Sequence, residues 1–364
     1  MTNLLETKKD LKMFSSENDF INHLKEVRDN SNWNTLQSGE TSFEVENGIL
    51  YVLTDGMKTP VRECGLTSVE NRCELYGSAI ERLMLIFPNL VGETLTKAIQ
   101  SKKNSLMKGY LQYGEYSAIH SDTYTPIDMV DVFEKIISHI KGLNILDDDC
   151  LASAEWSFDR TSALFVCNNA KLIESYSKAL KEHEFEVQKV VPKVRVTVSD
   201  IATSGINMNY SIDALISGTR YRIPLSSDNN NGIYHKGTLS KKMTALQDKL
   251  DSMFNLFSEA IENITKLMDV VIYNPVNCMI GLFKSLKLPV KYSSEVVEKF
   301  MATNGDTPCS AYEVYAGMTE YVSIVETVSD KQLTELKKLQ LEETLAKALK
   351  KDFTNYDVSG TVAW

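Results

Sequence analysis

The sequence predicts an α+β fold: an antiparallel-rich central sheet with helices on one face, followed by a helical C-terminal part with one long helix. Apolar and polar residues alternate in the middle of the chain, segments of helical period interrupt them, and helical periodicity is continuous from residue 239 onward. We therefore expect three parts. They are an N-terminal helical segment with a small hairpin over 1–108, a β-rich α+β core over 109–235, and a helical C-terminal region over 236–364.

The N-terminal part begins with a helix and a hairpin. Residues 17–29 carry apolar side chains at helical spacing behind Ser16, a residue type typical of helix N-caps. Residues 41–54 then alternate on both sides of Asn47-Gly48, a pair that favours a tight hairpin turn.

Helical periodicity returns over residues 66–105. The pattern predicts a helix that ends at Phe87-Pro88 and a second helix from Glu93 to about Gln100.

The middle of the chain alternates strands and helices. Strands are expected within 109–127, 152–169, 187–201, 206–216 and 219–225, and helices over 128–141 and 170–183. This order predicts helices packed across an antiparallel sheet.

The C-terminal part is helical throughout. A long helix is expected over 238–271 because its apolar positions advance by alternating fours and threes. Shorter helices are expected over 275–287, 294–303, 308–327 and 331–351. The apolar stripes of the long helix and of the last helix either pack within one chain or bury a partner chain, and we expect a homo-oligomer.

Composition is that of a folded, soluble chain. Hydrophobic residues make up 43% and charged residues 24%, which are average values for globular proteins. The N-terminus shows no signal peptide, and no apolar run is long enough to cross a membrane, so we expect a cytoplasmic protein without membrane partners, in the host cytoplasm if it is phage-encoded. The six cysteines, too widely spaced for a zinc site, are expected to be small buried hydrophobic residues: Cys64, Cys73, Cys150, Cys167, Cys278 and Cys309.

Catalytic motifs are missing from the sequence. It contains no GxSxG, HExxH or glycine-rich phosphate loop. His120 either pairs with Asp122 or caps a turn, and the acidic run 147–149 either binds a divalent cation or forms a solvated loop, which is the commoner case. We expect no catalytic residues, no cofactor, no metal and no enzyme activity.

Charge is distributed unevenly along the chain. The net charge is -10, yet residues 189–249 hold nine basic against four acidic residues, a local charge of +5 that leaves -15 for the remainder. Such asymmetry favours one phosphate-attracting groove on an otherwise acidic surface. An ordinary polar outer face of a sheet accounts for the same pattern.

The candidate nucleic-acid contacts all come from this basic segment. They are Lys189, Lys193, Arg195, Arg220, Arg222, Tyr234, His235, Lys236, Lys241 and Lys242. Lys193 and Arg195 share one strand face, and Arg220 and Arg222 repeat the arrangement; we expect these charges to be exposed and removable without loss of the fold. Tyr221 is expected on the opposite, buried face, whereas Tyr234 offers a ring for base stacking.

Four segments of the chain form a recognisable series: YSAIHSDTYTPIDMVDVFEKI (116–136), FVCNN (165–169), the HKG before the long helix (235–237) and TPCSAYEVYAGMTEYV (307–322). Together they resemble a phage- and plasmid-borne family, domain of unknown function 932, and the resemblance covers roughly residues 110–326. The chain departs from the family pattern at SGINMNYS and SSDNNNG. Members of this family have no established activity and accompany recombination and antirestriction genes.

Two functions follow from the resemblance and the charge pattern. The first is non-catalytic binding of single-stranded DNA, as in a recombination or annealing factor. The alternative is inhibition of a host defence protein, a restriction enzyme or nuclease, by an acidic surface that imitates DNA phosphates.

Overall fold

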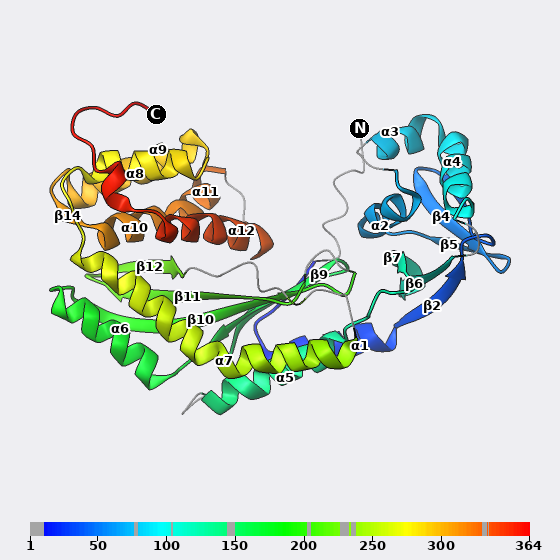
Figure 1. The fold of residues 1–364 in the computed structure, drawn as a ribbon, viewed down its shortest axis with the longest axis horizontal. Coiled ribbons are helices and arrows are strands. Elements are labelled where there is room, and N and C mark those ends of the chain that lie inside the picture. Colours follow the sequence, from blue (N-terminus) through cyan, green and yellow to red (C-terminus); the bar gives the residue numbers. More distant parts are fainter. Residues whose placement is uncertain are drawn as a thin grey trace.

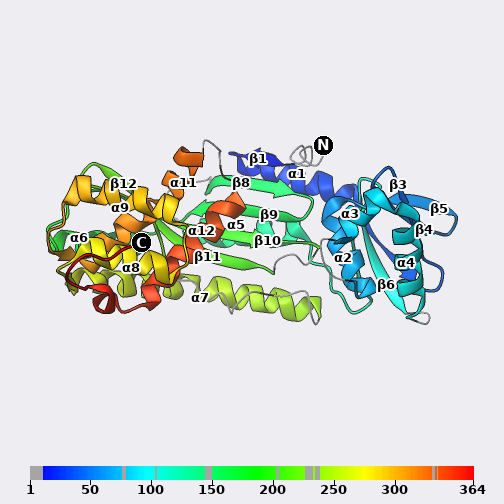
Figure 2. The same ribbon diagram turned by 90° about the horizontal axis from the view of Figure 1, so that it is seen from above.

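The computed structural model describes residues 11–75, 79–102, 105–143, 150–201, 205–225, 233, 238–329, 333 and 335–364. A six-stranded antiparallel sheet occupies the middle of an elongated molecule (Figure 1). A smaller N-terminal lobe lies beyond one end of this sheet, and the C-terminal helices lie at its other end (Figures 1 and 2). The predicted α+β class, with its antiparallel sheet and long C-terminal helix, is confirmed.

The central sheet has the strand order β1-β8-β9-β10-β11-β12. Its strands are β1 Lys12–Phe14, β8 Leu151–Ser157, β9 Arg160–Val166, β10 Val187–Val198, β11 Asn207–Ile216 and β12 Thr219–Pro224. Ser217 and Gly218, with φ of 49° and 78°, form the two-residue turn that joins β11 to β12. This turn sets the register that places the cations of β12 beside β11.

One face of the central sheet is apolar, and helices cover it. The helices α5 Met129–Leu143, α6 Ala170–Glu182 and α7 Leu239–Thr265 lie on this face (Figure 1). α7 buries Leu246, Leu250, Met253, Phe257, Ile261 and Ile264. The apolar stripe of the long helix therefore packs within the chain, which is one of the two outcomes expected from the sequence.

The C-terminal helices extend over the opposite face of the sheet, which is polar along β10, β11 and β12. They are α8 Pro275–Ser285, α9 Val290–Asn304, α10 Ala311–Thr319, α11 Tyr321–Ser329 and α12 Glu335–Ala346. The Tyr315 hydroxyl of α10 donates to the Pro224 carbonyl of β12 at 2.6 Å. This buried hydrogen bond fixes the helical lobe against the edge strand. The remaining short elements are η3 Lys266–Asp269, β13 Val271–Ile272, β14 Cys309–Ser310, η4 Lys347–Lys350 and η5 Phe353–Tyr356.

The single helix expected over 308–327 is two helices, α10 and α11. The Glu320 N–H donates to the Gly317 carbonyl, a tightened last turn at which the chain changes direction. The two halves bury different aromatic rings, since Tyr315 faces β12 whereas the Tyr321 ring packs 5.8 Å from that of Phe283 on α8.

The N-terminal lobe contains two three-stranded sheets. One is β2 Ser31–Gln37, β6 Leu106–Gln112 and β7 Glu115–Ser121; the other is β3 Ser42–Glu46, β4 Ile49–Thr54 and β5 Met57–Pro60. Because β6 pairs with β2, the boundary expected after residue 108 falls inside β6, and residues 106–121 belong with this lobe. Pairing between strands so far apart in the chain leaves no local sequence signal.

Local signals in this part of the chain are largely confirmed. Helix α1 Glu17–Asp29 begins behind Ser16, whose hydroxyl accepts from the Asp19 N–H, and Asn47 and Gly48 adopt the positive φ of a tight turn. Helices α2 Glu63–Cys73, α3 Ala79–Ile86 and α4 Pro88–Gln100 follow. The predicted start at Glu93 is wrong, because Pro88 opens α4 at the first helical position, which tolerates its missing N–H.

Within the described residues, none of the helices combines the length and the apolar character that crossing a bilayer demands.

Candidate functional site

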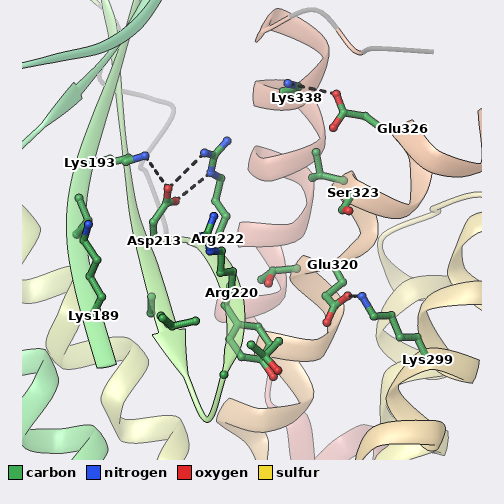
Figure 3. Close-up of a pocket in the computed structure, with 18 of the residues that line it drawn as sticks. Lys189, Lys193, Asp213, Arg220, Arg222, Lys299, Glu320, Ser323, Glu326 and Lys338 are labelled. Atoms are coloured by element: carbon green, nitrogen blue, oxygen red, sulfur yellow. Dashed lines mark hydrogen bonds and ion pairs between the residues drawn. The ribbon is translucent and has the colours of Figure 1, made fainter. Parts of the chain in front are cut away.

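A polar groove lies between the polar face of β10, β11 and β12 and the helices above it. It encloses about 980 Å³, near the upper end of the range for small-molecule sites. Six basic and three acidic side chains line it (Figure 3): Lys189, Lys193, Arg220, Arg222, Lys299 and Lys338, with Asp213, Glu320 and Glu326. We call it the polar groove, and it is the candidate site.

Strand register explains how the sheet contributes its charges. Lys189 pairs across Leu215 with Arg220, so the two cations lie in one row on strands that flank β11. In the next row Asp213 lies beside Arg222. The predicted sharing of one strand face by alternate cations is thus what the register produces.

Asp213 neutralises two of the cations on this face, Lys193 and Arg222. The Lys193 ammonium donates to Asp213 Oδ2 at 2.6 Å, and Arg222 Nε donates to Asp213 Oδ1 at 3.0 Å (Figure 3). Burial alone would raise the pKa of Asp213, but the hydrogen bonds from Arg222 and Lys193 outweigh burial and hold this pKa below its ordinary value. The carboxylate therefore stays charged and binds both cations.

Arg195 lies deeper on the same face and is 3% exposed. Its Nη2 lies 3.7 Å from Glu342 Oε2 of α12, and the other oxygen of Glu342 lies 3.7 Å from Arg222 Nη1. Asn209 of β11 also donates to Glu343 of α12 at 3.0 Å. The expectation that Arg195 is an exposed phosphate contact is wrong, because α12 covers this end of the face and supplies a buried counter-ion.

Two further ion pairs stand on the helical wall of the polar groove. Lys299 of α9 pairs with Glu320, and Lys338 of α12 pairs with Glu326 at 3.2 Å (Figure 3). Sequence reasoning missed all four residues, because nothing local distinguishes them from other charges on helix surfaces.

Lys189 and Arg220 are the cations without such a partner. Both are exposed, and neither forms an ion pair with a carboxylate among the residues that the structure describes. They lie at the end of the polar groove near the β11–β12 turn (Figure 3). An excess of positive charge therefore remains at this end of the groove.

Other predicted contacts lie elsewhere. Lys242 is 3% exposed in α7, on the other side of the sheet, where its ammonium donates to the Thr125 carbonyl at 3.3 Å and burial lowers its pKa. It is not the exposed contact that was expected, because α7 turns this residue inward. Lys241 is exposed on the same helix and does not line the polar groove. Tyr234, His235 and Lys236 lie outside the described residues.

Two tyrosines of the basic segment have different surroundings. Tyr221 pairs with Ala214 and so points to the face of β12 opposite Arg220 and Arg222, as expected. It is half-buried against the main core and, because β12 is the edge strand, it also lines the polar groove. Tyr210 is buried, with its ring 5.1 Å from that of Phe257 on α7. Tyr221 is thus the aromatic side chain that the groove offers to a ligand.

His120, which was considered for catalysis, lies within the described residues. The imidazole of His120 stacks on Tyr124 with ring centroids 4.1 Å apart, and the acidic run 147–149 lies outside the described residues. No group of three or more histidine, cysteine or acidic side chains in the described part of the chain is arranged to hold a metal ion. Burial raises the pKa of Cys64, Cys167, Cys278 and Cys309 to about 12, so these thiols remain protonated at neutral pH.

No family model, no curated protein and no solved structure matches this chain. The resemblance to domain of unknown function 932 stays a prediction.

Proposed function

We propose that the polar groove binds single-stranded DNA, without catalysis, as part of a phage- or plasmid-type recombination or annealing factor in the cytoplasm. The observation that carries the proposal is the excess of cations on the groove wall, with Lys189 and Arg220 outside any ion pair with a described carboxylate.

The spacing of these two cations suits a phosphate backbone. Lys189 and Arg220 lie two strands apart in one row, which corresponds to about 10 Å along the sheet. Their long side chains reach either one phosphate or two successive phosphates of a strand that crosses the row. Tyr221 in the groove wall supplies a ring on which a base stacks, and single strands recognised by stacking need no particular sequence.

The paired cations have a different role. Lys193 and Arg222 share Asp213, so a phosphate gains little from them unless it displaces that carboxylate. We therefore assign the main phosphate contacts to Lys189 and Arg220, with Lys193 and Arg222 in support.

Binding of a labelled oligonucleotide of ~40 bases at two salt concentrations tests the proposal. We expect binding at low salt that weakens as salt rises, because phosphate contacts release counter-ions. Absence of binding at low salt, or binding without salt dependence, contradicts it. Should a pull-down from host lysate recover one stoichiometric host enzyme and no nucleic acid, the alternative of an inhibitor of a host defence protein replaces it.

Self-association is the second part of the proposal, and the α3–α4 corner is where we expect it. The corner exposes more than half of each of four apolar side chains: Leu85, Ile86, Phe87 and Leu90. Exposed apolar clusters of this kind mark interaction sites. Its charged neighbours, Glu81, Arg82, Glu93 and Lys97, are two of each sign, so two copies can face each other across a two-fold axis without net repulsion.

A further inference from the structure

A second cavity lies where the N-terminal lobe joins the central sheet. It encloses about 180 Å³, similar to the cavity of about 150 Å³ that holds benzene in another protein. Trp33 of β2, Tyr110 of β6, Trp156 of β8 and Asp200, two residues beyond β10, all line it. Elements of both the lobe and the sheet thus contribute to its wall.

Asp200 is the unusual member of this wall. Its side chain is buried, and its Oδ2 accepts hydrogen bonds from the Tyr110 hydroxyl at 2.9 Å and from the Gln112 amide at 3.4 Å. Both donors are neutral, and no cationic side chain within the described residues forms an ion pair with it. A buried carboxylate normally has a counter-ion. The cavity beside Asp200 has the volume to hold a small cation, and the carboxylate supplies the opposite charge.

The charges around the cavity also favour a cation. Burial raises the pKa of Asp200 to about 6 against the hydrogen bond from Tyr110, and the carboxylates of Asp159 and Asp128 raise it further. Arg28 at the cavity wall lies 3.8 Å from Asp128, so the charges of these two side chains offset each other. The field inside the cavity is therefore negative.

The walls determine which kind of cation fits. The Trp33 ring stacks with the rings of Tyr110 and Tyr124, at centroid distances of 4.5 and 5.2 Å, so this side of the cavity is aromatic. A divalent metal ion needs six or more oxygen ligands, or retained water, and the cavity provides one buried carboxylate. A small organic cation gains from both the carboxylate and the aromatic walls.

We propose that this cavity binds a compact organic cation of the alkylammonium class, with its charge against Asp200 and its alkyl groups against Trp33, Tyr110 and Trp156. The site is independent of the polar groove, and neither proposal requires the other.

Tetramethylammonium is the probe, and tert-butanol is a neutral compound with the same number of heavy atoms. Two of the three tryptophans line the cavity, so in a Trp364→Phe background all the tryptophan fluorescence reports on it. We expect a saturable fluorescence change with tetramethylammonium and none with tert-butanol or with sodium chloride at equal ionic strength.

Asp200→Asn keeps the shape of the side chain and removes its charge, and it should weaken binding at least roughly tenfold. Asp122→Asn, which removes a charge from an exposed loop residue, is the matched control and should bind as the parent does. Ser31→Leu fills the cavity while Asp200 stays in place, and it should also abolish binding. No saturable change, an equal response to tert-butanol, or undiminished binding by Asp200→Asn would each overturn the proposal.

Discussion

Glu342 of α12 lies 3.7 Å from Arg195 of β10, and both side chains are buried beneath the helical lobe. The second oxygen of Glu342 approaches Arg222, so one carboxylate joins two strands to one helix. This pair ties the position of α12 to the polar face of the sheet and sets one boundary of the polar groove.

Removing one partner of this pair should destabilise the protein strongly. Glu342→Ala leaves Arg195 buried without that carboxylate, which costs roughly 3–5 kcal/mol for pairs of this kind. Chemical denaturation measures the loss, and Glu343→Ala, which removes the neighbouring carboxylate, is the control. The double variant Arg195→Met/Glu342→Leu should recover most of the stability, because apolar side chains of similar size replace the buried charges.

The two cations without ion-pair partners should dominate the salt dependence of DNA binding. Lys189→Ala/Arg220→Ala should lower the slope of log affinity against log salt by about 1.4, since each lost contact to a single strand contributes roughly 0.7. Lys178→Ala/Lys266→Ala removes the same charge from the exposed surface of α6 and η3 and should leave the slope unchanged. Equal slopes in both double variants would place the DNA outside the polar groove.

Asp213 should oppose binding of anions, because its carboxylate occupies Lys193 and Arg222. Asp213→Asn should therefore strengthen binding of the same oligonucleotide and steepen its salt dependence. Asp248→Asn on α7 removes an equal charge on the other side of the sheet. A gain of the same size in both variants would indicate a general charge effect instead of a local one.

Asp200 should make the folded state less stable as pH rises. Its pKa is raised from 3.8 to about 6 on folding, so the folded state holds its proton more tightly than the unfolded chain. This destabilisation of the folded state is absent below about pH 4, because both states are then protonated. It grows between about pH 4 and pH 6, where the unfolded chain has lost the proton, and is complete above about pH 6. Asp200→Asn should be more stable than the parent at pH 8, by at most about 3 kcal/mol, and the difference should shrink at pH 5. Denaturant unfolding at the two pH values measures it, and a constant difference would contradict the assignment.

The α3–α4 corner should control self-association. Leu85→Glu/Leu90→Glu should convert an oligomer to a monomer in sedimentation velocity without loss of the fold, because both side chains are more than half exposed. Val290→Glu/Met301→Glu adds the same charge at exposed apolar positions of α9 and should leave the oligomer intact. A parent protein that is monomeric at all concentrations would disprove the expected homo-oligomer.

Much of the secondary structure follows from the sequence alone, because its causes are local. Ser16 begins α1, Asn47-Gly48 makes the first hairpin, and the alternating residues of β10 divide into an apolar and a polar face. The length of α7 follows from its apolar stripe. Each of these features depends on residues within a few turns of one another.

The candidate site depends on contacts that no local pattern contains. Alternation along β10 places Lys189, Lys193 and Arg195 on one face, but the three side chains differ in burial and in ion pairing. Lys189 stays exposed, Lys193 pairs with Asp213 of the next strand, and Arg195 is buried against a helix near the end of the chain. The sequence by itself determined the fold class and the sign of the charge on this face. Tertiary structure alone decided which of these cations remain exposed at the groove, because the strength of a charge's pairing depends on the carboxylates and the burial that distant segments bring to it.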